Sequence, residues 1–257
     1  MQKVLFVIPT YNEKENIEKM LTQLNAEFKK INSENQEYLF QILFVDDTSP
    51  DGTAAEIKRL QKEFNNVYLL LNPEKAGLGI AYIKGFKYGL EKFKPDIVFQ
   101  MDADLSHQPK YIKDILQALK EGNDYVIGSR YVKGGDIEGW DFKRKMISKG
   151  GNLLSRMISG LPVNDCTAGF KGMKAEFLKK VDFSELEVKG YAFQISLLFE
   201  AIRKGFKVKE IPITFIDRIL GKSKLDGMDI KEFFINSFKL RKKLRKMKLN
   251  ERNPKKT

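Results

Sequence analysis

The sequence predicts an α/β fold built on a mostly parallel, doubly wound sheet with helices on both faces. Short continuous apolar runs alternate with segments whose apolar residues recur at helical spacing, a pattern typical of such sheets. Three of the runs end in polar residues: Pro9-Thr10-Tyr11-Asn12-Glu13, Asp46-Asp47 and Asp102-Ala103-Asp104. Because ligands of these sheets bind beyond the carboxyl ends of the strands, we expect the three polar segments to meet at one edge.

The first half of the chain contains the clearest elements. Apolar runs without alternation indicate strands that are buried on both faces. The expected strands are residues 4–8, 41–45, 67–71 and 97–101. Asn12 is expected to cap the first helix, with Glu15 completing a capping box. Thr53 opens a second helix after the turn residues 49–52, and residues 77–89 have helical spacing with interspersed glycines.

The pattern loosens beyond a strand expected at residues 125–127. Glycines at 134–135, 139 and 150–151 predict mobile connections around a helix near residues 144–158. Residues 208–215 are expected to form another strand, in which Pro212 indicates an edge or a bulge.

The composition limits the class of protein. With 257 residues, 42% of them hydrophobic, the chain can bury one sizeable core. A single cysteine, Cys166, excludes an internal disulfide and favours a reducing compartment. No stretch approaches the roughly 20 apolar residues of a membrane span, and no cleavable leader is evident. We therefore expect a cytoplasmic protein, or one bound peripherally to the cytoplasmic face of a membrane.

The net charge of +12 is concentrated at the end of the chain. Residues 239–257 hold ten Lys or Arg residues and one acid, Glu251. A basic tail is typical of proteins that bind anionic lipid or nucleic acid, and it is equally typical of a solvated terminus. The nearly balanced remainder argues against a nucleic-acid-binding domain, which needs a basic face on its folded part.

Asp102 and Asp104 are the strongest candidates for chemistry. Two carboxylates one residue apart at a strand end can bind Mg²⁺ or Mn²⁺, and the metal can neutralise a diphosphate. The alternative is a pair of turn carboxylates. His107, the only histidine, is expected to support this segment rather than to bind metal.

Asp46 and Asp47 repel each other unless something binds there, so one of them is expected to contact a nucleotide, although turn formation explains part of the segment. Tyr11 and Glu13 are candidate contacts of the base. Cations near glycine-rich segments are candidates for holding phosphates, and surface salt bridges are their alternative. They are Arg130, Arg144, Arg218 and Lys224. Cys166 lacks a nearby base and is expected to be structural.

These segments together resemble glycosyltransferase family 2, specifically the dolichyl-phosphate (polyprenol-phosphate) mannose synthases. The matching pieces occur in the family's order across about the first 225 residues. They are residues 8–13, 45–53, 101–107, 128–131, 165–170 and 216–225.

The resemblance implies a GT-A type, Rossmann-like nucleotide-sugar-binding domain over residues 1–225. It assigns the nucleotide-sugar contacts to Pro9, Tyr11, Glu13, Val45, Asp46, Asp47 and Asp102. The metal ligands would be Asp102 and Asp104, with Ser106 as an uncertain third. It places the acceptor phosphate at Arg130, Arg144, Arg218 and Lys224, and the catalytic set would be Asp104, Arg130, Arg218 and Lys224.

The implied activity is transfer of mannose from GDP-mannose to a dolichyl or polyprenyl phosphate. A phosphate monoester has a second pKa of about 6 and is already nucleophilic at neutral pH, so no catalytic base is needed. A single displacement would invert the sugar's configuration. Transfer of glucose from UDP-glucose is the main alternative, and an inactive relative or a nucleic-acid-binding protein is more remote.

Residues 226–257 are expected to form an amphipathic and basic helix or tail. Longer members of the family that the sequence resembles carry transmembrane helices there, and we expect none in residues 226–257. The segment can lie in a membrane interface, or pack on the catalytic domain. A separate membrane-anchoring subunit is a further alternative.

Overall fold

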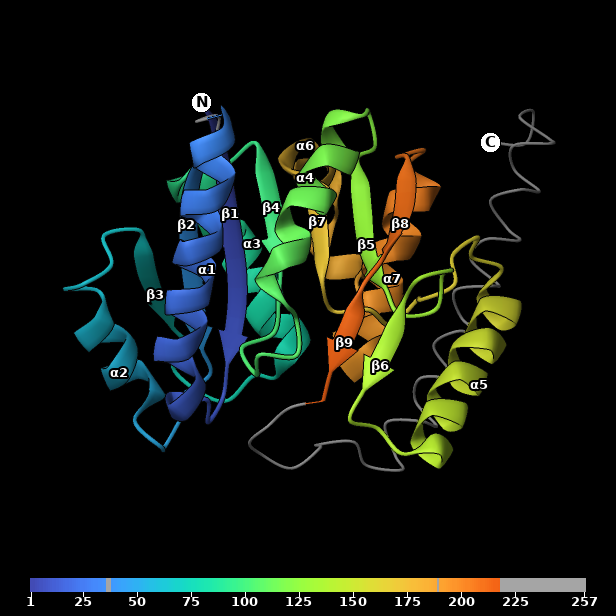
Figure 1. Ribbon diagram of the computed structural model, residues 1–257, viewed down its shortest axis with the longest axis horizontal. Coiled ribbons are helices and arrows are strands. Elements are labelled where there is room, and N and C mark those ends of the chain that lie inside the picture. The colour runs from blue at the N-terminus through green and yellow to red at the C-terminus, as the bar shows by residue number, and fades with distance from the viewer. Residues whose placement is uncertain (36–37, 189, 218–257) are drawn as a thin grey trace.

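The computed structural model describes residues 1–35, 38–188 and 190–217 (Figure 1). The predicted tail at 226–257, the domain boundary at residue 225, and two of the predicted phosphate ligands, Arg218 and Lys224, lie outside these residues. They therefore stay predictions.

A seven-stranded sheet forms the centre of the described chain, with the order β3-β2-β1-β4-β7-β5-β8. Its strands are β1 (Gln2–Thr10), β2 (Tyr38–Asp46), β3 (Val67–Leu71), β4 (Ile97–Gln100), β5 (Tyr125–Ser129), β7 (Lys171–Lys174) and β8 (Val208–Pro212). The pairings β1–β2, β1–β4, β2–β3 and β5–β8 are parallel. Only β7 runs against its neighbours β4 and β5. The prediction of a mostly parallel sheet is confirmed.

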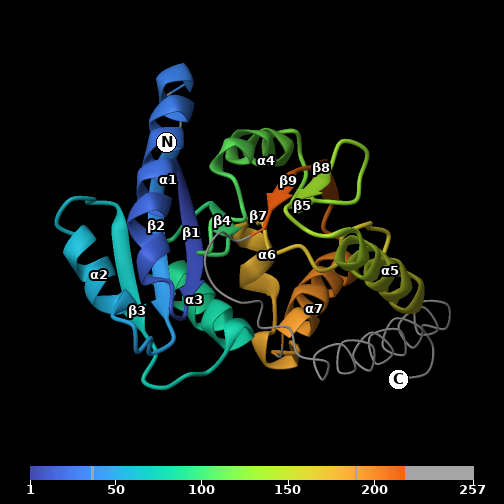
Figure 2. The same cartoon turned by 60° about the horizontal axis from the view of Figure 1, so that its bottom comes forward.

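Helices cover both faces of this sheet (Figures 1 and 2). On one face lie α1 (Lys14–Asn35), α2 (Thr53–Leu60) and α4 (Ile112–Lys120), which share one buried apolar cluster with Val4, Phe6 and Ile8 of β1. On the other lie α3 (Leu78–Lys92), α6 (Ala175–Lys180) and α7 (Gly190–Arg203), which share a second cluster with Leu5 and Val7. Burial on both sides is why β1 reads as a continuous apolar run.

A second, two-stranded sheet extends the carboxyl edge of the main one. β6 (Asp136–Glu138) pairs in parallel with β9 (Thr214–Ile216). Below β6 in Figure 1 the chain turns into α5 (Phe142–Ser159). Two short 3₁₀ turns, η1 (Pro109–Tyr111) and η2 (Phe183–Glu185), complete the described elements. This small sheet and α5 bring the segment 136–159 to the edge at which the polar strand ends were predicted to meet.

Three local predictions were wrong. Asn12 does not cap α1, because it has a positive φ of 59° and its backbone N–H donates to Ser49 Oγ at 3.0 Å. Asparagine tolerates this left-handed conformation, which returns the chain from β1 toward the helix. Gly150 and Gly151 lie inside α5 rather than in a connection. Residues 208–215 form two strands rather than one, and Pro212 ends β8 at the predicted sheet edge.

Candidate active site

A cavity of about 390 Å³ lies at the carboxyl ends of β1, β2 and β4. It brings together most of the residues selected from the sequence: Pro9, Tyr11, Glu13, Asp47, Asp102, Asp104, Arg130 and Arg144. Residues from α3, α7, β9 and the loop before β7 complete its wall. Val45, Asp46 and Ser106 do not line it, although all three had been assigned to the site.

Asp102 follows β4 and is held by contacts with Tyr82 and His107. The Tyr82 hydroxyl donates to its Oδ1 at 3.2 Å, and burial raises the pKa of Tyr82, which keeps that hydroxyl protonated. The backbone N–H of Asp102 donates to Nδ1 of His107 at 3.1 Å. The buried His107 ring stacks on Phe170 with a centroid distance of 5.2 Å. His107 therefore positions Asp102, which agrees with the supporting role expected for it.

Gly169 sets the space in front of the Asp102 carboxylate. A Cβ at this position would lie 2.9 Å from Asp102 Oδ2 and 3.0 Å from His107 Cε1. Both distances are shorter than ordinary contacts, so a side chain at this position would have to displace the Asp102 carboxylate or the His107 ring. The antiparallel β7 starts at this edge, and it is this reversal that delivers Gly169 to the carboxylate.

Asp104 is largely buried, and its Oδ1 accepts hydrogen bonds from the backbone N–H and the hydroxyl of Ser106. Ser106, the third metal ligand that the resemblance implied, therefore orients the Asp104 carboxylate. Leu105, between them, has a positive φ of 65°, so the chain turns tightly after the second aspartate. The turn aims Asp104 into the same cavity as Asp102.

The adjacent Asp46 and Asp47 face different ways. Asp46 is buried and accepts hydrogen bonds from Thr10 Oγ1 at 3.1 Å and from Ser49, so it stabilises the turn. Asp47 lines the cavity and accepts from the backbone N–H groups of Ala76 and Gly77. Although burial alone would raise the pKa of Asp47, these bonds and one from Asn72 hold it below the usual value. Asp47 is therefore a carboxylate at neutral pH.

An aromatic ring and a lysine stand together in one wall of the cavity. The Lys75 ammonium lies 3.9 Å from the centre of the Tyr11 ring, a cation–π contact. Glu13 precedes α1, and its Oε2 accepts from Asn16 at 2.8 Å. Tyr11, Glu13 and Lys75 all line the cavity.

Arg130 is fixed in the opposite wall by a buried carboxylate. Its Nε and Nη2 donate to the two oxygens of Asp165, each at 2.7 Å. The side chains of Arg130 and Asp165 are 9% and 0% exposed. Burial alone would raise the pKa of Asp165, but the guanidinium lowers it below the usual value. Arg130 is thus half of a buried ion pair as well as a cavity residue.

Arg144 forms a more open pair. Its Nη1 donates to Asp217 Oδ2 at 2.8 Å, and both side chains keep a quarter to a third of their exposure. Its guanidinium lies 4.1 Å from the centre of the Trp140 ring. Arg144, Trp140 and Asp217 line the cavity together. Solvent access makes this pair easier to exchange for another anion than the Arg130–Asp165 pair.

Comparison with known proteins identifies the family. A family model described as glycosyl transferase family 2 matches residues 5–182, more than half of the chain. The chain belongs to glycosyltransferase family 2. This result and the sheet order confirm the predicted family and the GT-A type fold.

Two relatives of this glycosyltransferase are similar over most of its length. It is 41% identical over 232 residues to polyprenol monophosphomannose synthase of Mycolicibacterium smegmatis, covering 90% of this chain and 84% of the relative. It is also 41% identical over 234 residues to undecaprenyl-phosphate mannosyltransferase of Micrococcus luteus, covering 91% and 92%.

A solved structure supports the fold. Glucosyl-3-phosphoglycerate synthase from Mycobacterium tuberculosis, in complex with Mn²⁺, UDP-glucose and phosphoglyceric acid, aligns with a TM-score of 0.66 at 16% identity. The alignment covers 94% of this chain and 80% of that one.

The carboxylates of this glycosyltransferase fit a divalent cation. Within the described residues no three His, Cys, Asp or Glu side chains are grouped as a metal site. Asp102 and Asp104 nevertheless open into one cavity, and Asp102 Oδ2 has the side-chain-free face of Gly169 before it. Mg²⁺ and Mn²⁺ accept such a set, because one or two carboxylates plus water and substrate phosphates complete their coordination.

The sequence reasoning missed several cavity residues. Lys75, Trp140 and Gln194 line the cavity without belonging to any polar strand end. Asp165 was noticed only as part of a matching segment, and the pairing of Arg130 with it required the fold. Cys166 is buried, and burial raises the pKa of its thiol to about 12, so the structural role expected for it agrees with the structure.

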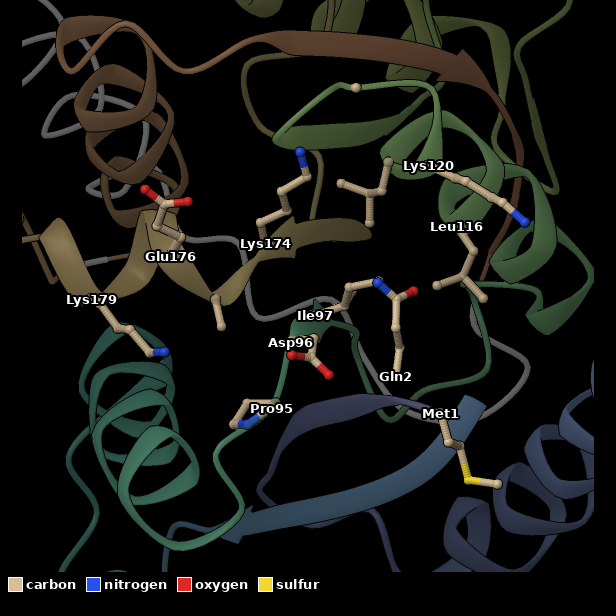
Figure 3. A pocket seen from close by; sticks show the side chains of 13 residues that line it. Met1, Gln2, Pro95, Asp96, Ile97, Leu116, Lys120, Lys174, Glu176 and Lys179 are labelled. Atoms are coloured by element: carbon tan, nitrogen blue, oxygen red, sulfur yellow. The ribbon is translucent and has the colours of Figure 1, made fainter. Parts of the chain in front are cut away.

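A larger cavity, of about 780 Å³, lies at the amino ends of β1 and β4, where Met1, Gln2 and Asp96 line it (Figure 3). None of the residues selected from the sequence line it. Its lysines Lys120, Lys174 and Lys179 come from α4, β7 and α6, and Lys174 pairs with Asp124 at 2.8 Å.

Within the described part of the chain, no helix is long and apolar enough to cross a membrane.

Proposed function

We propose that this chain transfers mannose from GDP-mannose to a polyprenyl phosphate at a membrane surface, with inversion of the sugar's configuration. One observation carries the proposal: a single cavity holds the carboxylates Asp102 and Asp104 between two walls. We call them the nucleotide-side wall, formed by Tyr11, Glu13, Asp47 and Lys75, and the arginine wall, which contains Arg130 and Arg144. The two relatives at 41% identity are named for mannose transfer to such lipids.

The nucleotide-side wall suits the donor. Tyr11 offers a ring face for a base, while Glu13 and Asp47 offer acceptors for its N–H groups or for ribose hydroxyls. Lys75 brings a cation to the same wall. Asp102 and Asp104 would hold Mg²⁺ or Mn²⁺, and the ion would neutralise the departing diphosphate.

The arginine wall suits the acceptor. A phosphate monoester is largely ionised at neutral pH, so the wall needs to orient it rather than to deprotonate it. Arg144 is the better placed ligand, because a phosphate can replace Asp217 in a half-open pair. Arg130, held by Asp165, keeps the wall in shape. Arg218 and Lys224, outside the described residues, stay predicted phosphate ligands.

The surface of α5 favours peripheral contact with a membrane. Its exposed apolar side chains are Phe142, Met146, Ile147, Leu153, Leu154 and Met157. Its five basic residues, among them Lys145 and Lys149, are accompanied by no acid. Exposed apolar side chains flanked by cations suit the surface of an anionic bilayer. Because Arg144, in the first turn of α5, also lines the cavity, contact of α5 with the bilayer would bring the cavity close to a lipid phosphate. Contributions of residues 226–257 or of an anchoring subunit stay predictions.

The direct test is sugar transfer to undecaprenyl phosphate in detergent, with GDP-mannose and UDP-glucose supplied in parallel. We expect transfer from GDP-mannose that EDTA abolishes and that added Mg²⁺ or Mn²⁺ restores. Transfer from UDP-glucose alone would overturn the sugar assignment, and transfer that survives EDTA would overturn the metal assignment. Transfer from neither donor would overturn the proposed function.

A further inference from the structure

A buried polar network lies beneath the cavity and is used by none of the roles assigned above. It joins Gln100 at the end of β4, Lys171 at the start of β7 and Gln194 on α7. Oε1 of Gln194 accepts hydrogen bonds from Gln100 Nε2 and from Lys171 Nζ, each at 2.7 Å. All three side chains are at most 3% exposed, and Gln194 also lines the cavity.

Lys171 fixes which way the Gln194 amide points. Lys171 Nζ donates to Gln194 Oε1, and in its charged form the amine has donors and no acceptor, so the amide oxygen faces it. The Gln100 amide gives a second donor to the same oxygen. The Nε2 group of Gln194 is therefore turned away from both.

The amide nitrogen of Gln194 lacks a partner within the described chain. No described residue accepts a hydrogen bond from it. The nitrogen is also not fully enclosed by protein atoms, so it reaches the cavity space. A donor in a largely buried side chain is costly to leave unpaired. The geometry thus prepares an N–H group for an oxygen of a bound molecule.

The strands beneath Gln194 indicate which oxygen of a bound molecule its N–H group would meet. Tyr11 and Asp47 follow β1 and β2, while Arg130 follows β5 and Arg144 lies on α5. β4 and β7 lie between them, and Gln100 and Lys171 are cross-strand partners there, just before Asp102. Under the proposed function, the transferred hexose lies in this middle position, because it connects the diphosphate held near Asp102 to the incoming phosphate.

We propose that Gln194 Nε2 donates a hydrogen bond to a hydroxyl group of the transferred hexose, with Lys171 and Gln100 holding the amide in that orientation. This inference rests on the proposed function for the identity of the hexose. It makes Gln194 a sugar-recognising residue, while Lys171 and Gln100 are positioning residues.

The test compares a sugar nucleotide with its nucleoside diphosphate. Calorimetric titration with Mn²⁺ would measure GDP-mannose and GDP, and UDP-glucose and UDP, on the native protein and on Gln194→Met. We expect the variant to bind the transferred sugar nucleotide about tenfold more weakly and the diphosphate alone equally well, as for the loss of one buried hydrogen bond. Equal weakening of both, or of neither, would overturn the proposal.

Deoxygenated donors locate the contact. The donors are four analogues of GDP-mannose, each lacking the hydroxyl at C2, C3, C4 or C6. For the analogue that lacks the contacted hydroxyl, the affinities of the native protein and of Gln194→Met should agree within twofold. Independent penalties at all four positions would refute a hydroxyl contact, since only interacting groups are non-additive.

Two further variants separate recognition from folding. The triple variant Gln100→Met/Lys171→Met/Gln194→Met removes the donors and the acceptor together. It replaces Gln194→Met if that single variant is unstable, and it should show the same selective loss of sugar-nucleotide affinity. Gln117→Met, on the exposed side of α4, is the matched control and should change neither affinity. If the native protein transfers no sugar, the proposed function fails, while a selective loss of sugar-nucleotide affinity would still support Gln194.

Discussion

Replacing Asp165 by asparagine should destabilise the fold strongly, because it breaks the buried pair that fixes Arg130. The carboxylate accepts two guanidinium N–H groups at 2.7 Å, the Arg130 backbone N–H at 3.1 Å and the Thr167 hydroxyl at 3.3 Å. Asparagine keeps one acceptor oxygen and turns an amide donor toward the guanidinium, which has no acceptor. The charge of Arg130 is then buried and unbalanced.

The magnitude follows from the burial of the pair. Removing one partner of a buried ion pair costs about 3–5 kcal/mol, a large part of the roughly 5–15 kcal/mol that stabilises a domain. The folded-state pKa of Asp165 is lowered, so its stabilisation is present above the unfolded pKa and is lost as pH falls through the folded value. At pH 7 the full effect should be seen.

Urea unfolding followed by circular dichroism at pH 7 measures this loss. Asp182→Asn is the matched control, because Asp182 is exposed and its carboxylate hydrogen-bonds, among the described residues, to its neighbour Ser184. The control should lie within about 0.5 kcal/mol of the native protein. A loss below about 1 kcal/mol for Asp165→Asn would refute the view that the pair holds this wall of the cavity.

Three further predictions follow from single contacts. Gly169→Ala places a methyl group 2.9 Å from Asp102 Oδ2, so sugar transfer should fall at least tenfold with little loss of thermal stability; unchanged transfer would show that the loop yields. Asp104→Asn should abolish metal-dependent transfer and leave the circular dichroism spectrum intact, and full activity would remove Asp104 from the metal site. Burial lowers the pKa of Lys171 to about 7, so the unfolded chain binds more protons and stability should rise between pH 7 and pH 10. Lys171→Met should lack that rise in urea midpoint, whereas an identical rise in both proteins would show that Lys171 does not titrate.

The sequence was sufficient for the parts of the fold with a strong local pattern. Continuous apolar runs predicted β1 to β4, because parallel strands covered on both faces are apolar throughout. β7 was missed, since its four residues include two lysines and a glycine. That glycine is required by packing: a Cβ at Gly172 would lie 2.3 Å from the Ile115 side chain, a distance that only the fold reveals.

The candidate site was predictable where residues follow strand ends. Asp102, Asp104 and Asp47 line the cavity because carboxyl ends of neighbouring parallel strands meet at one edge. The sequence could not separate Asp46 from its neighbour, since the alternation of side chains depends on where the strand ends. Nor could it find Gln194, whose role depends on contacts with two strands distant in the chain.

The most direct test of the mechanism is the anomeric configuration of the product. Proton and phosphorus NMR of the lipid made from GDP-mannose and undecaprenyl phosphate would measure it. A single displacement across one cavity, between the Asp102 and Asp104 carboxylates and the arginine wall, predicts a β-linked mannosyl phosphate from the α-linked donor. An α-linked product would contradict this mechanism, because retention of the anomeric configuration requires a second displacement or attack from the same side as the leaving diphosphate.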